Sequence, residues 1–167
     1  MEKKVAIMQP YFCPYIGYFQ LMDSVDEFVI YDNIQYTKKG WINRNRIIEN
    51  GKDSLITLPL KNGPSRANVI DRELSYSWTK ERDKIYRRIY NLYRTAPHFK
   101  ASFEVIEDFL FHPDTNLFNY ILNSIKRINT YLNIDTNIII SSTLDIDHDL
   151  KSQDKVLTIC KEMKATH

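Results

Sequence analysis

KVAIMQPYFCPYIGYFQLMDSVDEFVIYD, the stretch from Lys4 to Asp32, decides the fold. Residues 4–8 are predicted to form a short buried strand, and a loop starts at Pro10 because proline cannot donate to a strand ladder. Residues 18–25 have the length and composition of a short helix, and residues 28–31 form a second apolar strand. A strand, a helix and a strand within about 30 residues predict a βαβ unit with a parallel strand pair.

The rest of the chain extends this pattern. Residues 46–60 are predicted to form a hairpin that turns at Asn50-Gly51, because glycine accepts positive φ at little cost. Apolar stripes predict two helices, and Pro97 and Pro113 bound a third between them. A buried strand at 138–140 and a helix from about residue 152 follow. The three helices span residues 77–94, 100–111 and 115–132.

We therefore predict an α/β fold with a Rossmann-like three-layer parallel sheet, an inserted hairpin and a helical segment, in a single domain of residues 1–167. Residues 1–60 and 135–167 would form the sheet core, and residues 75–133 the helical part. The sequence stops just after a helix, where a parallel α/β pattern normally returns to a strand. We expect that one or more C-terminal strands are missing.

Composition is that of an ordinary globular protein, with 43% hydrophobic and 26% charged residues. No apolar run approaches the roughly 20 residues of a membrane span, and the N-terminal strand is too short for a secretory signal, so a cytoplasmic location is expected. Cys13 and Cys160 are too few for a disulfide framework and are predicted to be reduced thiols. A formal net charge of +2 argues against a nucleic-acid partner.

Charge is nevertheless uneven along the chain. Residues 33–48 hold Lys38, Lys39, Arg44 and Arg46 and no acidic side chain. Such a patch attracts phosphate, and arginine grips phosphate through two hydrogen bonds. The alternative interpretation is a solvated basic hairpin with Trp41 in the core and Asn43 capping a turn.

Ligands of parallel sheets gather at the carboxyl ends of the strands, which is where the loop from residue 9 and Asp32 would lie. Ser141 and Ser142 follow the third buried strand and could bond a phosphate or a hydroxyl, or simply cap the next segment. In the loop we expect Phe12, Ile16, Phe19 and Leu21 to pack inward, and Gln9, Tyr11, Tyr15 and Tyr18 to face a ligand.

A metal site is not predicted, because the four histidines lack the spacing of known metal motifs. His148 lies between Asp147 and Asp149, where a neighbouring carboxylate could raise its pKa, but a solvated acidic loop is the favoured interpretation.

Several blocks resemble the signature of the WbqC-like proteins, a family associated with bacterial O-antigen and surface-polysaccharide gene clusters. The blocks are Val5–Phe12, Pro14–Phe19, Tyr31-Asp32, Gln35-Tyr36, Lys39–Asn45, Leu58-Pro59, Ser141-Ser142, Ile159–Lys161 and Ala165-Thr166. The resemblance covers essentially the whole chain, and members of the family look longer, which fits the expected truncation.

A weaker likeness concerns ATP. The loop with Pro14, Gly17 and Tyr18 is laid out like the histidine-containing loop of nucleotidylyltransferases and adenylate-forming ligases, and Ser141-Ser142 is similar to their late serine-rich segment. In those enzymes both blocks hold the triphosphate of ATP, so the likeness implies ATP as a cofactor. Tyr15 and Tyr18 stand near the histidine positions, and neutral phenols stabilise phosphate charge less well than imidazolium.

These residues predict an enzyme, a transferase or an adenylate-forming ligase, that N-acylates or aminoacylates a nucleotide-activated amino sugar or acts on another phosphorylated small molecule. Asp32 would be the base or an orienting group near the reacting amine, and Lys39 and Arg44, with Arg46 as a further candidate, would hold the diphosphate. The predicted binding residues are Gln9, Tyr11, Tyr15, Gly17, Tyr18, Gln35, Tyr36, Trp41, Asn43, Asn45, Arg46, Ser141 and Ser142. The alternative is a non-catalytic module that binds glycans or pathway partners, and single-stranded nucleic acid ranks third. The sequence leaves a homodimer open.

Overall fold

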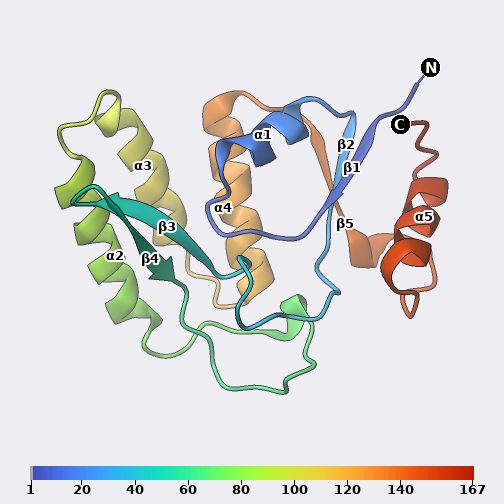
Figure 1. Ribbon diagram of the computed structural model, residues 1–167, viewed down its shortest axis with the longest axis horizontal. Coiled ribbons are helices and arrows are strands. Elements are labelled where there is room, and N and C mark those ends of the chain that lie inside the picture. The colour runs from blue at the N-terminus through green and yellow to red at the C-terminus, as the bar shows by residue number, and fades with distance from the viewer. Residues whose placement is uncertain (1) are drawn as a thin grey trace.

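A parallel sheet lies to the right of centre in Figure 1 in the computed structural model, which describes residues 2–167. Within those residues the sheet has three strands in the order β1-β2-β5, paired in parallel throughout. The helix that joins β1 to β2 confirms the predicted βαβ unit. The elements are β1 (Val5–Met8), α1 (Ile16–Asp23), β2 (Glu27–Ile30) and β5 (Asn137–Ile140).

The segment between β2 and β5 carries an antiparallel hairpin and three α-helices, as predicted. Glu49 pairs with Lys52, which leaves Asn50-Gly51 as a two-residue turn with φ of 52° and 73°. These positive φ values explain why asparagine and glycine occupy the turn. The elements are β3 (Arg44–Glu49), β4 (Lys52–Thr57), the short 3₁₀ turn η1 (Val69–Asp71), α2 (Trp78–Tyr93), α3 (Phe99–Leu110) and α4 (Leu117–Leu132).

After β5 the chain makes the 3₁₀ turn η2 (Ser141–Thr143) and the helix α5 (Ser152–Glu162). Alternate strand residues face opposite sides of the sheet. Val29 packs with Ile159 of α5, whereas Phe28 belongs to the main core with α1 and α4. Figure 1 accordingly shows α1 and α4 on one side of the sheet and α5 on the other. The described residues thus form an α/β structure with three layers at the sheet.

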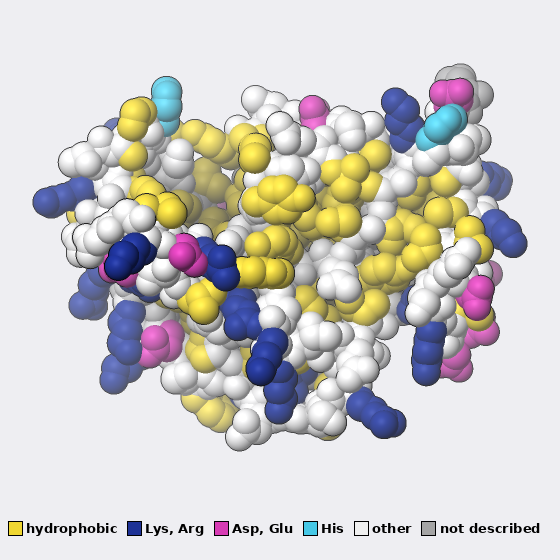
Figure 2. All heavy atoms as spheres, viewed as in Figure 1, with side chains coloured by type: hydrophobic (Ala, Val, Ile, Leu, Met, Phe, Trp, Pro, Cys, Tyr) yellow, Lys and Arg dark blue, Asp and Glu magenta, His cyan; other side chains and the backbone are white. Residues whose placement is uncertain are grey.

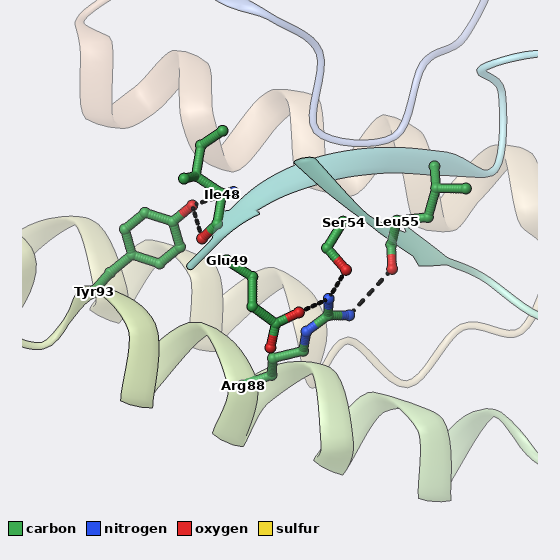
Figure 3. Close-up of polar contacts among 6 residues, drawn as sticks. All are labelled: Ile48, Glu49, Ser54, Leu55, Arg88 and Tyr93. Carbon is green, nitrogen blue, oxygen red and sulfur yellow. Dashed lines mark hydrogen bonds and ion pairs between the residues drawn. The ribbon is translucent and has the colours of Figure 1, made fainter. Parts of the chain in front are cut away.

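The hairpin is fixed to α2 by two side chains, as Figure 3 shows. Arg88 donates to the carboxylate of Glu49 at 2.5 Å, to the carbonyl of Leu55 at 3.1 Å and to the hydroxyl of Ser54. The hydroxyl of Tyr93 accepts from the Ile48 amide at 2.8 Å and donates to its carbonyl at 3.3 Å. These contacts hold the hairpin and α2 together in one fixed arrangement.

Three predicted side-chain orientations in and beside α1 are wrong. Ile16 and Leu21 were expected to pack inward but are 63% and 36% exposed. Tyr18 was expected to face a ligand but is 1% exposed, and its hydroxyl donates to the carbonyl of Gln9 at 3.1 Å. The buried stripe consists of Tyr18, Phe19 and Met22, and Ile16 and Leu21 lie roughly 110° around the helix from its centre.

None of the helices in residues 2–167 combines the length and the apolar character needed to span a membrane.

Candidate functional site

The carboxyl ends of the three parallel strands bring together blocks that are far apart in the sequence. Met8 is in register with Ile30, and Ile30 with Ile140, so the residues that follow these strands emerge at one edge of the sheet. These are the loop from Gln9, the turn at Asp32 and the turn η2. The strand register therefore brings these three blocks together, as predicted.

Asp32 is held in one orientation at this edge. Its side chain is 3% exposed, and Oδ1 accepts hydrogen bonds from the Ser141 hydroxyl and the Ser142 amide, both at 2.9 Å. Oδ2 accepts no hydrogen bond from the residues that the structure describes. The Ser141 hydroxyl also lies 2.9 Å from Asn33 Oδ1, and its one proton can serve only one of these acceptors at a time. Asp32 therefore presents one free carboxylate oxygen in a fixed position.

Sequence reasoning missed Asn33 and Lys155 and assigned His148 to a solvated acidic loop, and these three residues complete this group. Lys155 of α5 is 6% exposed, and its ammonium donates to Asn33 Oδ1 at 3.1 Å and to the carbonyl of His148 at 3.4 Å. The Asn33 amide nitrogen lies 2.9 Å from Nδ1 of His148. No carboxylate of residues 2–167 comes within 4.0 Å of the ammonium. We call Asp32, Asn33, Ser141, His148 and Lys155 the strand-end cluster.

A buried ammonium without a carboxylate is costly, and an anion beside it would lower that cost. One sequence signal could have identified it. Lys155 stands four residues before the buried Ile159 and eight before the buried Met163, so it occupies the apolar stripe of α5. A lysine on such a stripe is a sequence signal. His148 offers none, because it is exposed and joins the group only through its ring and its backbone carbonyl.

A second group surrounds Tyr36, which is 9% exposed. The Tyr36 hydroxyl donates to Asn43 Oδ1 at 3.0 Å, and the amide of Asn43 donates to the carbonyl of Leu58 at 2.8 Å. The guanidinium carbon of Arg72 lies 5.1 Å from the centre of the Tyr36 ring. Burial raises the pKa of Tyr36, and the charges of Arg72 and Arg44 partly oppose that rise. Both guanidinium groups therefore act on the same phenol.

Arg72 and Arg44 also lack acidic partners among residues 2–167. Arg72 is 8% exposed, donates from Nη2 to the carbonyl of Lys61 at 2.9 Å, and has no described partner for the buried Nε. Arg44 donates from Nε to the carbonyl of Gly40 at 2.7 Å. We call Tyr36, Asn43, Arg44 and Arg72 the arginine cluster. Its charge is not compensated within the described chain, which is the arrangement that attracts an anionic ligand.

The aromatic loop, residues 9–19, is fixed against the start of β3. The Asn45 amide donates to the carbonyls of Phe12, at 3.1 Å, and Cys13, and the Phe12 amide donates to the carbonyl of Ile42 at 3.0 Å. Cys13 has a φ of 49°, an unfavourable value for a residue with a side chain, and these contacts hold it there. The loop is therefore preorganised rather than loose.

Aromatic and cationic side chains lie together beside the loop. The rings of Tyr11 and Trp41 are 6.2 Å apart, and the guanidinium carbon of Arg46 lies 5.0 Å from the Trp41 ring. Burial raises the pKa of Tyr11, a like charge at Tyr15 adds to the rise, and Arg46 partly opposes it. Arg46 also pairs with Asp53 at 3.2 Å, although both side chains are more than half exposed.

The predicted binding residues thus fall into two kinds. Four of them shape the site, because their polar groups form hydrogen bonds within the protein: Tyr18, Tyr36, Asn43 and Asn45. The hydroxyl of Ser141 forms its hydrogen bonds within the strand-end cluster. Gln35 is exposed but donates to the carbonyl of Ser65 at 3.2 Å. The accessible members are the exposed Gln9, Tyr15, Lys39, Trp41, Arg46 and Ser142 and the half-buried Tyr11, Gly17 and Arg44.

Lys and Arg side chains gather along the lower middle of the face in Figure 2, where Figure 1 shows the segment that joins β2 to β3. No group of three or more His, Cys, Asp or Glu side chains that could hold a metal ion occurs in residues 2–167. The geometry therefore offers a positively charged, partly aromatic surface, which suits a phosphorylated ligand, and a separate oriented carboxylate at the strand ends, which suits a proton acceptor.

Comparison with known proteins identifies the family of this chain. The model of the WbqC-like protein family matches residues 9–167. The chain belongs to the WbqC-like protein family. A relative in Mycobacterium tuberculosis, the uncharacterized protein Rv1507c, is 32% identical over 170 residues, which cover 98% of this chain and 70% of the relative. No solved structure matches the chain. Family membership agrees with the sequence motifs, and both clusters lie within the matched residues.

Proposed function

We propose that the protein is a cytoplasmic enzyme of bacterial O-antigen or other surface-polysaccharide synthesis that N-acylates or aminoacylates a nucleotide-activated amino sugar. The observation that carries the proposal is the arginine cluster, in which the buried Arg72 lies over the ring of Tyr36 and neither Arg72 nor Arg44 has an acidic partner in residues 2–167. A diphosphate supplies the negative charge that such a pair requires. The family name supplies the polysaccharide context.

In this proposal each group has one role, and the buried Arg72 and Asp32 act from beneath the surface. Arg44 and Arg72, with the exposed Lys39, hold the diphosphate, and the half-exposed Trp41 stacks on the base or the sugar. Asp32 accepts the proton on its free Oδ2. The amine nitrogen of the sugar attacks the carbonyl carbon of an activated acyl donor and forms the C–N bond. The bond to the leaving thiolate or adenylate breaks with its electron pair, and the amine proton passes to Asp32.

In an ATP-dependent version, an oxygen of the acyl carboxylate would attack the α-phosphorus of ATP on this same protein, which would form the acyl adenylate and release pyrophosphate. The three-layer arrangement and the turn η2 at the end of β5 support this version by analogy with nucleotidylyltransferases. The ammonium of Lys155 would offset phosphate charge there, and Ser142 would contact a phosphate oxygen, because the Ser141 hydroxyl bonds Asp32. We treat residues 1–167 as one domain in this scheme, in the fold class of Rossmann-like sheets.

Isothermal titration tests the proposal with dTDP- and UDP-amino sugars and, separately, with ATP. Binding of at least one nucleotide sugar should weaken at least tenfold in Arg44→Ala. Arg87→Ala is the matched control, because the Arg87 side chain is exposed on α2 and makes no hydrogen bond or ion pair with residues 2–167. The absence of heat with every nucleotide sugar, at protein concentrations suited to micromolar affinity, would refute the proposal.

A non-catalytic glycan-binding module is the second candidate, and the exposure of aromatic rings favours it. Tyr15 is 63% exposed, Trp41 43% and Tyr76 92%, and exposed rings provide stacking surfaces for sugars. The two candidates respond differently to Arg44→Ala. A glycan module should keep its affinity for neutral oligosaccharides in this variant, whereas an enzyme should lose both nucleotide-sugar binding and turnover.

A further inference from the structure

A cavity of about 560 Å³ lies apart from the strand-end cluster, between the aromatic loop, the hairpin and helices α2, α3 and α4. Figure 2 shows the hollow on the upper left of the face, with hydrophobic side chains around it. Nearly all of its lining is apolar, for example Phe12, Ile56, Ile89, Phe103 and Ile128. Its volume falls within the roughly 300–1,000 Å³ of small-molecule sites.

The walls of the cavity are fixed by polar contacts between the elements that form them. Arg88 fastens the hairpin to α2 through Glu49, and Tyr93 fastens it through Ile48 (Figure 3). On the opposite wall, Asn45 holds the carbonyls of the aromatic loop. A hollow between elements tied in this way is preorganised for a ligand.

The lining selects the chemistry of the ligand. A sugar or a nucleotide would lose its hydrogen bonds to water in this cavity and regain few, whereas a saturated chain would lose none. Arg46 is the one charged residue of the lining, and its side chain is 53% exposed, so the cation lies where the cavity meets solvent. An apolar interior with a cation at its opening fits a hydrocarbon chain that ends in an anionic or carbonyl group.

Strand β3 connects this cavity to the proposed site. Asn45, Arg46 and Ile47 line the cavity, and the preceding residue, Arg44, belongs to the arginine cluster. The aromatic loop is a second shared wall, because Phe12 lines the cavity while Tyr11 contacts Trp41. A ligand whose tail fills the cavity would therefore place its head next to the cations that we assign to the nucleotide sugar.

We propose that the cavity binds the hydrocarbon chain of a fatty acyl group, presented as a fatty acid or as its activated thioester. The binding itself is independent of the reaction proposed above, but the role of the chain as the group transferred to the amino sugar rests on that proposed function. A fatty acyl thioester would supply the carbonyl carbon that the amine attacks, and the thiolate would leave with the bonding electrons.

Binding of saturated fatty acids from 6 to 16 carbons, measured by displacement of an apolar fluorescent probe, tests the proposal directly. Affinity should rise about fourfold for each added methylene until the cavity is full and then level off. Levelling off indicates a bounded cavity, whereas a rise that continues through the whole series would indicate nonspecific association and overturn the proposal. Absence of binding below the solubility limit of every acid would also overturn it.

Two tryptophan substitutions test whether the fatty acid binds in the cavity or elsewhere on the surface. Ala96 lines the cavity but is exposed, so Ala96→Trp should block the opening without disturbing the core, and should lower affinity at least tenfold. Ala101 is exposed on α3 and does not line the cavity, so Ala101→Trp should bind as the unchanged protein does. Equal losses in the two variants would contradict the assignment.

Two further experiments identify the form of the ligand and test whether a second copy of the protein fills the cavity. Tighter binding of the coenzyme A thioester than of the acid of equal length would identify the activated donor, and equal affinity would identify the free acid, each of which supports the cavity site. A dimer in sedimentation that Ala96→Trp alone converts to a monomer would show that a second copy fills the cavity, which overturns the proposal. Failure of nucleotide-sugar titration together with a levelled chain-length series would refute the proposed function and leave this site intact.

Discussion

Removal of one hydroxyl in Ser141→Ala should release Asp32 from its fixed orientation and destabilise the protein. Ser141 is fully buried, and its Oγ donates to Asp32 Oδ1 at 2.9 Å. The substitution removes one of the two hydrogen bonds to that oxygen and leaves the amide of Ser142 as the other. The carboxylate stays almost wholly buried with half of its recorded protein contacts.

The size of the effect follows from the charge of the acceptor. A hydrogen bond to a charged group contributes about 1.5–3 kcal/mol to stability. Urea unfolding followed by tryptophan fluorescence measures the loss, because Trp78 is buried and Trp41 is partly exposed. With a urea dependence of about 2 kcal/mol per molar, the midpoint should fall by about 0.7–1.5 M.

The adjacent position is a matched control. Ser142 contributes its backbone amide to Asp32, and its exposed side chain takes no part in the contact, so Ser142→Ala should change stability by less than about 0.5 kcal/mol. Equal losses in Ser141→Ala and Ser142→Ala would refute the reasoning, because the effect would then not come from the buried hydroxyl.

Three further predictions concern the loop and the hairpin. Asn45→Ala should lower the free energy of unfolding by about 1–3 kcal/mol, since it leaves two loop carbonyls without their donor, whereas the exposed Asn62→Ala should be near neutral in the same urea assay. Gly51→Ala should destabilise the protein by about 1–2 kcal/mol, because φ is 73° at this position even though there is space for a Cβ. Gly51→Asn should recover most of the loss, because asparagine tolerates positive φ better than alanine does. Equal Tm values for the two variants would contradict this prediction. The hydrogen bond from Arg88 holds the pKa of Glu49 below its ordinary value of 4.5, so its stabilisation is present above that pH and is lost as the pH falls through the lowered value. The stability advantage of the unchanged protein over Glu49→Gln should therefore shrink in acid unfolding below about pH 4, and a pH-independent difference would contradict it.

The elements were predictable from sequence because each depends on residues that are near one another in the chain. The turn at Asn50-Gly51 follows from φ preferences, and the buried stripe of α4 follows from a helical period that Phe118, Ile121 and Ile125 satisfy. The βαβ unit follows from two short apolar strands with a helix between them. These local signals also predicted that the aromatic loop and Asp32 would share one edge of the sheet.

Side-chain directions in the aromatic loop were less predictable. Helix α1 begins at Ile16 rather than at Tyr18. Each residue advances the helix by about 100°, so the position of the buried stripe on the helix decides which side chains face water. Tyr18 and Ile16 consequently exchange the roles that the sequence pattern assigned to them.

The sequence by itself determined the α/β character of this protein, its hairpin turn and the family to which it belongs, since all three are properties of residue order. Only the tertiary structure brought Lys155 to Asn33, 122 positions away, and placed Arg72 over the ring of Tyr36. Contacts of that separation depend on how strands pair and helices pack, and no local pattern records them. The buried cations without acidic partners in residues 2–167, and the apolar cavity, are therefore properties of the fold.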